Sequence, residues 1–218
     1  TITAGQTTGT TSFTPTDDTT YEGNETGIIA IDTVSGGSAT ENGTQSVTIT
    51  ITDNESAPTV TLTSSASSIA ENAGSSLTLT ATLSVATTAN VTVGISTSGT
   101  GTEGADYATV SDITITAGST TGTTSFTPTD DSTFEGDETG IIAIDTVTGG
   151  SATENGTQSV TITINEDDSG PAFSISDVTT SNENAANATF TVTMSTTSSA
   201  TATIDYATSN GTATASSD

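Results

Sequence analysis

Residues 160–164 read Val-Thr-Ile-Thr-Ile, and the same five residues recur at 47–51. Apolar and polar side chains alternate here at every second position, which is the period of a β-strand with one buried face. Threonine suits the outward positions because its branched Cβ fits a pleated surface. The stretch therefore predicts a half-buried β-strand.

Outward from this stretch, six further segments between residues 58 and 171 have strand character, and no segment shows the period of an amphipathic helix. The apolar residues that mark them lie at Val60–Leu62, Leu77–Leu83, Val91–Ile95, Ile113–Ile115, around Phe126, and at Ile141–Ile144. Gly-rich turns such as Gly99–Gly104 separate them. Seven short strands in one unit predict an all-β fold, a seven-stranded antiparallel β-sandwich without helices of note.

The chain is built from a repeated unit. Residues 1–58 return as residues 114–171 with 48 of 58 positions identical, and residues 172–218 resemble the beginning of the unit that starts at Pro58. We therefore expect a complete module at 58–171, the C-terminal half of a module at 1–57, and the N-terminal half of a further module at 172–218. Because no initiator Met is present, we expect a segment of a longer polypeptide. A half-sandwich exposes strand edges and an apolar face, which favours association.

The composition is acidic throughout, with 26 Asp and Glu residues, no Lys, Arg or His, and a formal net charge of −26. Nucleic acids and anionic membranes are excluded as partners because both require Lys or Arg. The carboxylates must stay solvated, be screened by salt, or be held together by bound cations. A hydrophobic fraction of 30% with this charge is also typical of disordered chains, but the alternating runs favour a folded protein.

The sequence shows no secretion signal, membrane-spanning run or lipidation motif. The Thr-rich, Lys-free composition favours an extracellular or cell-surface location. Nucleophilic catalysis would need a His or Lys base, which the chain lacks. Glycoside hydrolysis would need a sugar cleft lined with aromatic residues, which form only 4% of the chain. We therefore predict that the protein is not an enzyme.

Four acidic clusters recur along the repeat, all in expected loops or at strand ends. In chain order the complete unit carries Glu71, Asp106, Asp130–Glu138 and Glu166-Asp167-Asp168. Their copies are Glu183, Asp218, Asp17–Glu25 and Asp53-Asn54-Glu55.

These motifs resemble those of Calx-β domains, the immunoglobulin-like modules of the sodium–calcium exchanger's regulatory region and of many large surface adhesins. The features that match, in order, are Glu-Asn-x-Gly, Asp-Tyr, an Ala-Gly-x-Thr turn, Asp-Asp-x-x-x-Glu-x-x-Glu and a closing acidic triplet. The resemblance covers the whole chain and implies that carboxylates from the four clusters converge at one end of each sandwich, beside the linker to the next module.

The resemblance implies Ca²⁺ as the bound cofactor and assigns its ligands. In the complete module they are Glu71, Asp106, Asp130, Asp131, Glu135, Glu166, Asp167 and Asp168. In the partial modules they are Asp17, Asp18, Glu22, Asp53 and Glu55 at the start, and Glu183 and Asp218 at the end. Asn54 stands where a carboxylate is usual, which implies fewer or more weakly bound ions in the first set.

Carboxylate chemistry supports a calcium site independently. Calcium takes six to eight oxygen ligands, and gathered carboxylates repel unless a cation lies among them. The absence of Cys and His argues against zinc and copper. The alternative is that these residues are solvated loop acids that keep the protein soluble.

We expect a structural repeat segment of an extracellular, calcium-stabilised stalk, adhesin or matrix fibre, with calcium at the module junctions making the array rigid. Two alternatives are a ligand-binding adhesin module that recognises a glycan or protein and a passive, metal-free spacer. The expected partners are copies of the chain or adjacent repeats arranged head to tail, with Asp218 of one near Asp17 and Asp18 of the next. A cell-surface or matrix ligand is a further possible partner.

Overall fold

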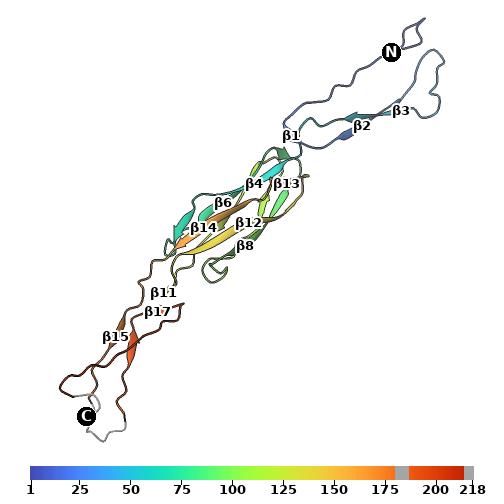
Figure 1. Ribbon diagram of the computed structural model, residues 1–218. Coiled ribbons are helices and arrows are strands. Elements are labelled where there is room, and N and C mark those ends of the chain that lie inside the picture. Colours follow the sequence, from blue (N-terminus) through green and yellow to red (C-terminus); the bar gives the residue numbers. More distant parts are fainter. Residues whose placement is uncertain (180–186, 214–218) are drawn as a thin grey trace.

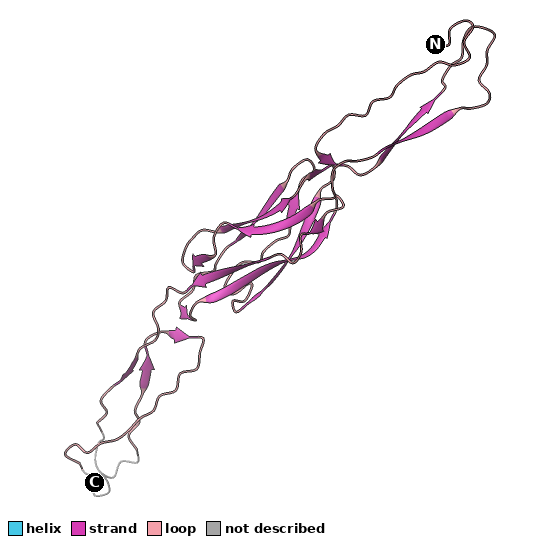
Figure 2. Ribbon diagram, turned by 45° about the horizontal axis from the view of Figure 1, so that its top comes forward, coloured by secondary structure: helices cyan, strands magenta, loops and turns pink. Residues whose placement is uncertain are grey.

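The computed structural model describes residues 1–179 and 187–213. Within these ranges the secondary structure is entirely β, and no helix is long and apolar enough to cross a membrane. The molecule is elongated, with residues 1–57 at one end, a β-sandwich in the middle, and the described residues after 171 at the other end (Figures 1 and 2).

The sandwich consists of two sheets. One has the strand order β10-β6-β4-β13 and the other β5-β14-β12-β8-β9. The strands of the first sheet are β4 (Thr59–Ser64), β6 (Leu77–Leu83), β10 (Thr121–Phe126) and β13 (Thr153–Glu154). Those of the second are β5 (Ser68–Ala70), β8 (Val91–Gly99), β9 (Ile113–Ile115), β12 (Glu138–Thr148) and β14 (Ser159–Asn165).

The all-β sandwich predicted from the alternating runs is confirmed, and each of the seven expected strands is present. Two details differ from the expectation. The structure adds four short strands, namely β5, β7 (Ala86–Thr87), β11 (Thr133–Phe134) and β13. The pairs β13–β4 and β14–β5 run parallel, whereas all strands were expected to be antiparallel. Strands of two or three residues are too short to show a period, and the direction of pairing depends on contacts far apart in sequence.

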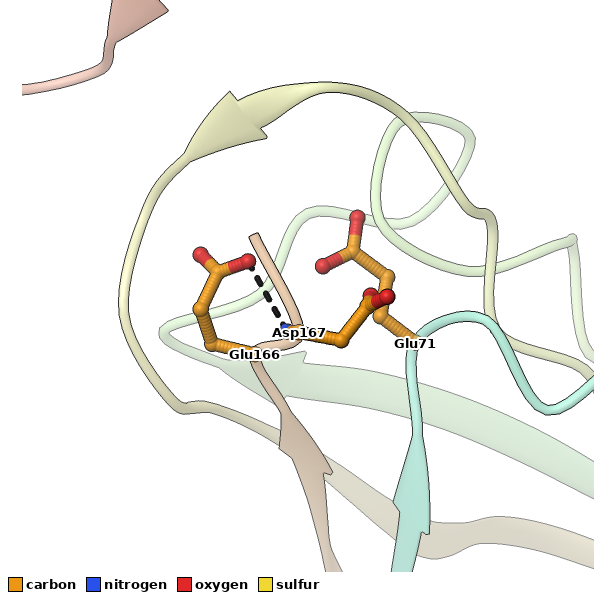
Figure 3. A group of neighbouring side chains, drawn as sticks. All are labelled: Glu71, Glu166 and Asp167. Atoms are coloured by element: carbon orange, nitrogen blue, oxygen red, sulfur yellow. Dashed lines mark hydrogen bonds between the residues drawn. The ribbon is translucent and has the colours of Figure 1, made fainter. Parts of the chain in front are cut away.

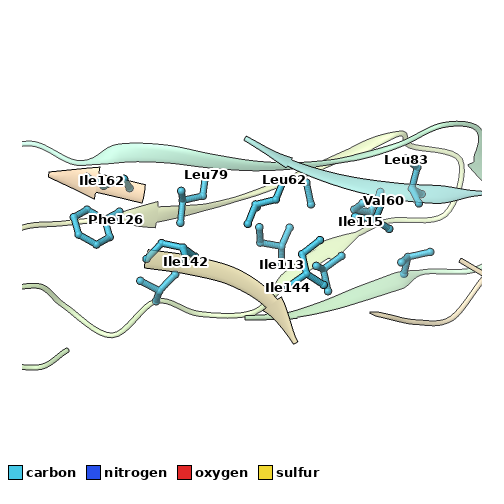
Figure 4. Close-up of a cluster of buried hydrophobic side chains, with 14 of the residues drawn as sticks. Val60, Leu62, Leu79, Leu83, Ile113, Ile115, Phe126, Ile142, Ile144 and Ile162 are labelled. Carbon is cyan, nitrogen blue, oxygen red and sulfur yellow. The ribbon is translucent and has the colours of Figure 1, made fainter. Parts of the chain in front are cut away.

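The core lies between the two sheets and follows the alternation (Figure 4). In β6 the side chains of Leu79, Ala81 and Leu83 are buried, while the intervening threonines face outward or are half-buried. Phe126 is fully buried and stacks on Tyr107 with ring centroids 4.8 Å apart. Each large aliphatic side chain buried in this way contributes about 1.5–3 kcal/mol. The buried hydrophobic residues of the described chain all lie between Val60 and Ile164.

Strands also form at both ends of the molecule. Towards the N-terminus, β2 (Glu25–Ala30) and β3 (Ser46–Ile51) form an antiparallel pair. Towards the C-terminus, β15 (Phe173–Ile175) pairs with β16 (Val192–Met194). Large apolar side chains remain exposed in both pairs, such as Ile28 at 72% and Ile175 at 63%.

Two short parallel pairs connect the ends to the sandwich. β1 (Thr20–Tyr21) pairs with β7, and β11 pairs with β17 (Thr197–Ser198). Thr20 lies opposite Ala86 at the first junction, and Thr133 lies opposite Thr197 at the second.

Candidate metal centre

Parallel pairing of β5 with β14 brings the first acidic residues together. Ala70 lies opposite Asn165, so both strands end at the same edge of the sheet. Glu71 follows β5 and Glu166 follows β14, and the Glu71 backbone N–H donates to the Asn165 carbonyl oxygen at 2.9 Å. Glu71 is only 9% exposed although its side chain is a carboxylate.

Two groups of three carboxylates form at this end of the sandwich. Oxygens of Glu71, Glu166 and Asp167 lie within 4.8 Å of one another, with the three side chains gathered around the end of β14 (Figure 3). Oxygens of Asp106, Glu135 and Glu138 satisfy the same limit.

Five of these six residues line a single cavity of about 10 Å³, which has room for one species the size of a water molecule. Asp106 comes from the loop between β8 and β9, Glu135 from the turn after β11, and Glu138 is the first residue of β12. With Glu71 after β5 and Glu166 after β14, four segments distant in sequence therefore supply oxygen atoms to one small space.

Glu166 organises the loop that faces it. Its Oε2 accepts hydrogen bonds from the backbone N–H groups of Glu135 at 2.5 Å and Gly136 at 2.8 Å, and its Oε1 accepts from Asp167 at 3.1 Å and Asp168 at 2.9 Å. Gly136 has φ = 82°, a conformation that glycine adopts without steric cost. Burial alone would raise the pKa of Glu166, but these backbone donors outweigh it and lower the pKa below its ordinary value.

The pKa of two neighbouring carboxyls moves in the other direction. Burial, opposed only partly by the hydrogen bond from the Asp131 N–H, raises the pKa of Glu71 to about 7, and the charges of Glu166, Asp131 and Asp167 add to the rise. Burial and the adjacent charge of Asp106 raise the pKa of Glu138 to about 7. Near neutral pH it is therefore unfavourable for Glu71 and Glu138 to be ionised at the same time as their acidic neighbours.

The remaining expected ligands of the module lie around the two groups rather than in them. Asp168 Oδ2 is buried and has no hydrogen-bond partner among the residues that the structure describes, and burial raises the pKa of this side chain. The Asp131 backbone N–H donates to Glu71 Oε1 at 3.3 Å. The Asp131 side-chain Oδ1 accepts a hydrogen bond from the Thr133 N–H at 2.6 Å. Asp130 and Asp131 are exposed.

The N-terminal copy of the site repeats part of this arrangement. Asp53 takes the place of Glu166, since its Oδ2 accepts from the backbone N–H groups of Glu22 at 2.8 Å and Gly23 at 2.6 Å. Its Oδ1 accepts from the Glu55 N–H at 2.9 Å. These backbone hydrogen bonds, that of Glu55 foremost, lower the pKa of Asp53.

A cavity of about 40 Å³ adjoins the Asp53 carboxylate in this copy. The carboxylates that line it are Asp18, Glu22, Glu25, Asp53 and Glu55. Asp17 does not line the cavity, and its Oδ1 accepts instead from the Asn54 amide at 3.2 Å. Counterparts of Glu71 and Asp106 belong to the other half of the repeat, and their later copies Glu183 and Asp218 lie outside the described residues.

The donors of the complete site fit a hard divalent cation such as calcium. They are carboxylate oxygens from several loops, which calcium accepts at about 2.3–2.6 Å. Three observations describe acceptors that a cation would stabilise. They are the oxygen spacing, the raised pKa values of Glu71 and Glu138, and the buried Asp168 oxygen, which has no hydrogen-bond partner among the described residues. The chain has no Lys, Arg or His to provide one.

Glu138 is a member of the second group that the sequence analysis did not assign as a ligand. It is the last residue of the Asp-Asp-x-x-x-Glu-x-x-Glu motif, so the signal was present in the sequence. Its position at the start of a strand made it resemble an ordinary strand end. Glu25 occupies the same position in the N-terminal copy and lines that cavity.

The same acidic loops also contact the neighbouring unit. Thr133 and Phe134, between Asp131 and Glu135, form β11 and pair with β17 (Figure 1). The Ser199 N–H donates to the Phe134 carbonyl oxygen at 3.2 Å, and the Thr196 hydroxyl donates to the Ser132 carbonyl oxygen at 3.3 Å. At the first junction β1, between Asp18 and Glu22, pairs with β7 in the same manner. The candidate site and the contact between units therefore share one loop.

Comparison with known proteins identifies the family. The Calx-beta domain family matches residues 53–168 and again residues 166–218. Among solved structures, the apo-form Calx CBD1 domain is 18% identical, covers 50% of this chain and 99% of its own length, and has a TM-score of 0.43. The CBD12 structure from CALX1.2 is 20% identical with a TM-score of 0.42, and the match covers 50% of this chain but 46% of that chain. No curated protein matches in sequence. Because the two family matches span well over half of its residues, the chain belongs to the Calx-beta domain family.

Proposed function

We propose that this chain is a structural repeat segment of an extracellular stalk, adhesin or matrix fibre, in which calcium at the module junctions makes the array rigid. The observation that carries the proposal is the position of the carboxylate groups, which lie in and against the loop that pairs with the next unit. A cation bound there would join carboxylates from four segments of one module next to the strand pair that holds the next unit.

Electrostatics supports the proposal. With a formal charge of −26 and no basic side chain, each junction gathers like charges that repel. A divalent cation removes this repulsion and turns it into attraction toward a shared centre. The junction would then resist bending, because separating the loops would expose charges that the ion holds together.

The residues best placed to hold the ion are the two groups of three. They are Glu71, Glu166 and Asp167, and Asp106, Glu135 and Glu138. Asp168, with its buried oxygen, and the exposed Asp130 and Asp131 adjoin the groups and are available as further ligands. The role is one of binding and support, without a catalytic step.

Calcium titration followed by thermal melting of the full chain tests the proposal. Ligand that binds only the folded state stabilises it by RT ln(1 + [L]/Kd), about 2.7 kcal/mol at a hundredfold excess over Kd. Extracellular calcium modules commonly have Kd values of about 10⁻⁴–10⁻³ M. We expect calcium to raise the melting temperature of the sandwich, a chelator to reverse the rise, and magnesium to substitute poorly because it gives up its water reluctantly.

Two variants of equal charge change provide the matched comparison. Glu138→Gln removes a carboxylate of the cavity, whereas Glu154→Gln removes one in β13, whose oxygen accepts a hydrogen bond from the Gln158 N–H, a contact that glutamine can keep. We expect the calcium-induced rise in melting temperature to shrink in Glu138→Gln and to persist in Glu154→Gln. Equal responses, or a wild-type melting curve that calcium leaves unchanged, would favour a metal-free spacer instead.

A further inference from the structure

The loop between β8 and β9 holds Asp106 in a closed turn. The N–H groups of Ala105 and Asp106 donate to the Thr102 carbonyl oxygen at 3.1 Å and 2.9 Å, and the Thr102 N–H donates to Asp106 Oδ2 at 2.6 Å. The Thr129 N–H donates to the Asp106 carbonyl oxygen at 2.9 Å. The direction in which this turn presents Asp106 to the cavity depends on how the rest of the loop is held.

A different carboxylate, that of Glu103, holds the rest of the loop. Its Oε1 accepts a hydrogen bond from the Val110 N–H at 3.3 Å, and its Oε2 accepts one from the Thr97 hydroxyl in β8. Glu103 is half-buried and is not among the residues that line the cavity. Its side chain therefore joins the two ends of residues 103–110 and fastens them to the sheet, with Asp106 between those ends.

The aromatic residue after Asp106 belongs to the same network. Tyr107 is 1% exposed and stacks on Phe126 in the core. The Tyr107 hydroxyl hydrogen-bonds to Thr97, the side chain that also donates to Glu103. One threonine thus links the Glu103 carboxylate to the buried ring, which restricts the movement of the segment that carries Asp106.

The repeat shows that the acidic motif does not itself demand a carboxylate at this position. Asp106 corresponds to Asp218 in the next repeat, and with that alignment Glu103 corresponds to Ala215. Glu103 also belongs to neither group of three carboxylates in the described chain. A further negative charge near an acidic loop is unfavourable, so the hydrogen bonds that Glu103 accepts are the reason to look for its role.

We propose that Glu103 is a positioning residue, which orders the loop that presents Asp106 to a cation without touching the ion. The inference rests on the proposed function, in which the group of Asp106, Glu135 and Glu138 holds calcium. An oxygen that is already fixed where the ion needs it loses less freedom on binding. Hydrogen-bonding partners that orient metal ligands typically contribute about ten- to hundredfold to metal affinity.

Two substitutions of Glu103 separate its hydrogen bonds from its charge. Glutamine can keep both contacts, because its oxygen can accept the Val110 N–H and its amide can donate to Thr97 Oγ1. Alanine removes both. We expect Glu103→Ala to weaken calcium binding at the Asp106 group about tenfold or more, and Glu103→Gln to leave the affinity close to that of the wild type.

Asp112→Asn is the control for a loss of charge elsewhere in the same loop. Asp112 Oδ1 accepts a hydrogen bond from the Ile95 N–H at 2.9 Å, and the asparagine oxygen can keep this contact. We expect no loss of calcium affinity in this variant.

Calcium titration of the full chain, followed through the backbone amide signals in NMR spectra, resolves the individual sites. The signals of Asp106 and Glu138 report on the complete module, whereas those of Glu22 and Gly23 report on the N-terminal copy and serve as an internal reference. In Glu103→Ala the Kd from the first pair should rise, and that from the second pair should stay constant. A merely structural role would lower the melting temperature without changing the Kd of the folded molecules.

Thr97→Val tests whether Glu103 acts through the threonine. Valine has a similar shape but cannot donate to Glu103. We expect Thr97→Val to raise the Kd, and the double variant with Glu103→Ala to lose less affinity than the sum of the two single losses, because both changes break one network.

Hydrogen exchange in the presence of a chelator provides a measurement that does not depend on calcium. The N–H groups of Asp106 and Val110 should exchange faster in Glu103→Ala than in the wild type or in Glu103→Gln. The proposal is overturned if Glu103→Ala binds calcium as tightly as the wild type, if Glu103→Gln loses as much affinity as Glu103→Ala, or if these two groups exchange at the wild-type rate. If calcium leaves the wild-type signals unchanged, the proposed function fails as well, so the two failures are distinguishable.

Discussion

At the scale of single residues, the two carboxylates at the ends of β5 and β14 show how the local backbone decides the charge of an acid. Glu71 accepts one long hydrogen bond from a backbone N–H and is buried, so its pKa rises to about 7. Glu166, directly beside it, accepts four backbone N–H hydrogen bonds, and its pKa falls. Glu166 therefore stays charged and holds the loop, while the pKa values of Glu71 and Glu138 lie near neutral pH.

The raised pKa values of Glu71 and Glu138 predict how stability depends on pH without calcium. The folded state binds these protons more tightly than the unfolded state, so their contribution is fully present below the ordinary pKa and is lost as pH rises through about 7. We expect the melting temperature of the sandwich in calcium-free buffer to fall between about pH 5 and pH 7.5.

Glu71→Gln is the control for this pH dependence. Glutamine cannot ionise but can still accept the Asp131 N–H, so the decline should become shallower, with the remainder due to Glu138. Melting followed by circular dichroism across this pH range checks the expectation. A decline of the same size in Glu71→Gln would show that Glu71 does not titrate there.

At the scale of elements, β12 and β2 have the same sequence start, Glu-Thr-Gly-Ile-Ile-Ala, but different surroundings. β12 lies in the middle of the five-stranded sheet between β14 and β8. β2 pairs only with β3. Because the two strands share these six residues, the same substitution made in each strand measures how much tertiary packing contributes to stability.

Alanine substitution of the shared glycine tests this difference. A Cβ on Gly140 would lie 2.8 Å and 2.9 Å from ring atoms of Phe126, which is fully buried and stacked on Tyr107 and so has little room to move. We expect Gly140→Ala to lower the free energy of unfolding of the sandwich by about 1–3 kcal/mol. Gly27→Ala, whose Cβ would meet nothing within 4 Å, should leave it unchanged. Chemical denaturation of both variants gives the comparison, and a neutral Gly140→Ala would mean that the Phe126 ring has space to shift.

At the scale of the whole molecule, charge of a single sign dominates. All charged side chains are acidic, so no ion pair between side chains offsets the self-repulsion of the folded chain. The two junctions concentrate this charge where units must meet. Salt that screens these charges and a cation bound among them would therefore stabilise the folded chain in the same way.

This equivalence predicts a dependence on salt that calcium suppresses. With a chelator present, added sodium chloride should raise the melting temperature, because screening weakens repulsion between exposed carboxylates. With calcium present, the same salt series should have a smaller effect, since the most crowded carboxylates are already neutralised. Scanning calorimetry of the full chain in both series checks this. Parallel salt dependences would indicate that calcium does not act on the repelling groups.

The sequence by itself determined the seven longer strands of the sandwich, the all-β fold class, and where the repeat begins again. These features are local, since alternation of residues such as Leu79, Ala81 and Leu83 depends only on the two-residue period of a strand. It also placed the acidic residues at loops and strand ends. The family resemblance added the expectation that they converge.

Only the tertiary structure decided which of these acids share a cavity and what their environments do to them. The parallel pairing of β5 with β14 placed Glu71 beside Glu166, and the start of β12 brought Glu138 into the second group while Asp130 stayed exposed. Tertiary structure also decided how deeply identical sequences are buried. Ile142 is fully buried, whereas its counterpart Ile29 is 40% exposed. The physical reason is that proximity and burial depend on contacts between segments far apart in the chain, which no local pattern contains.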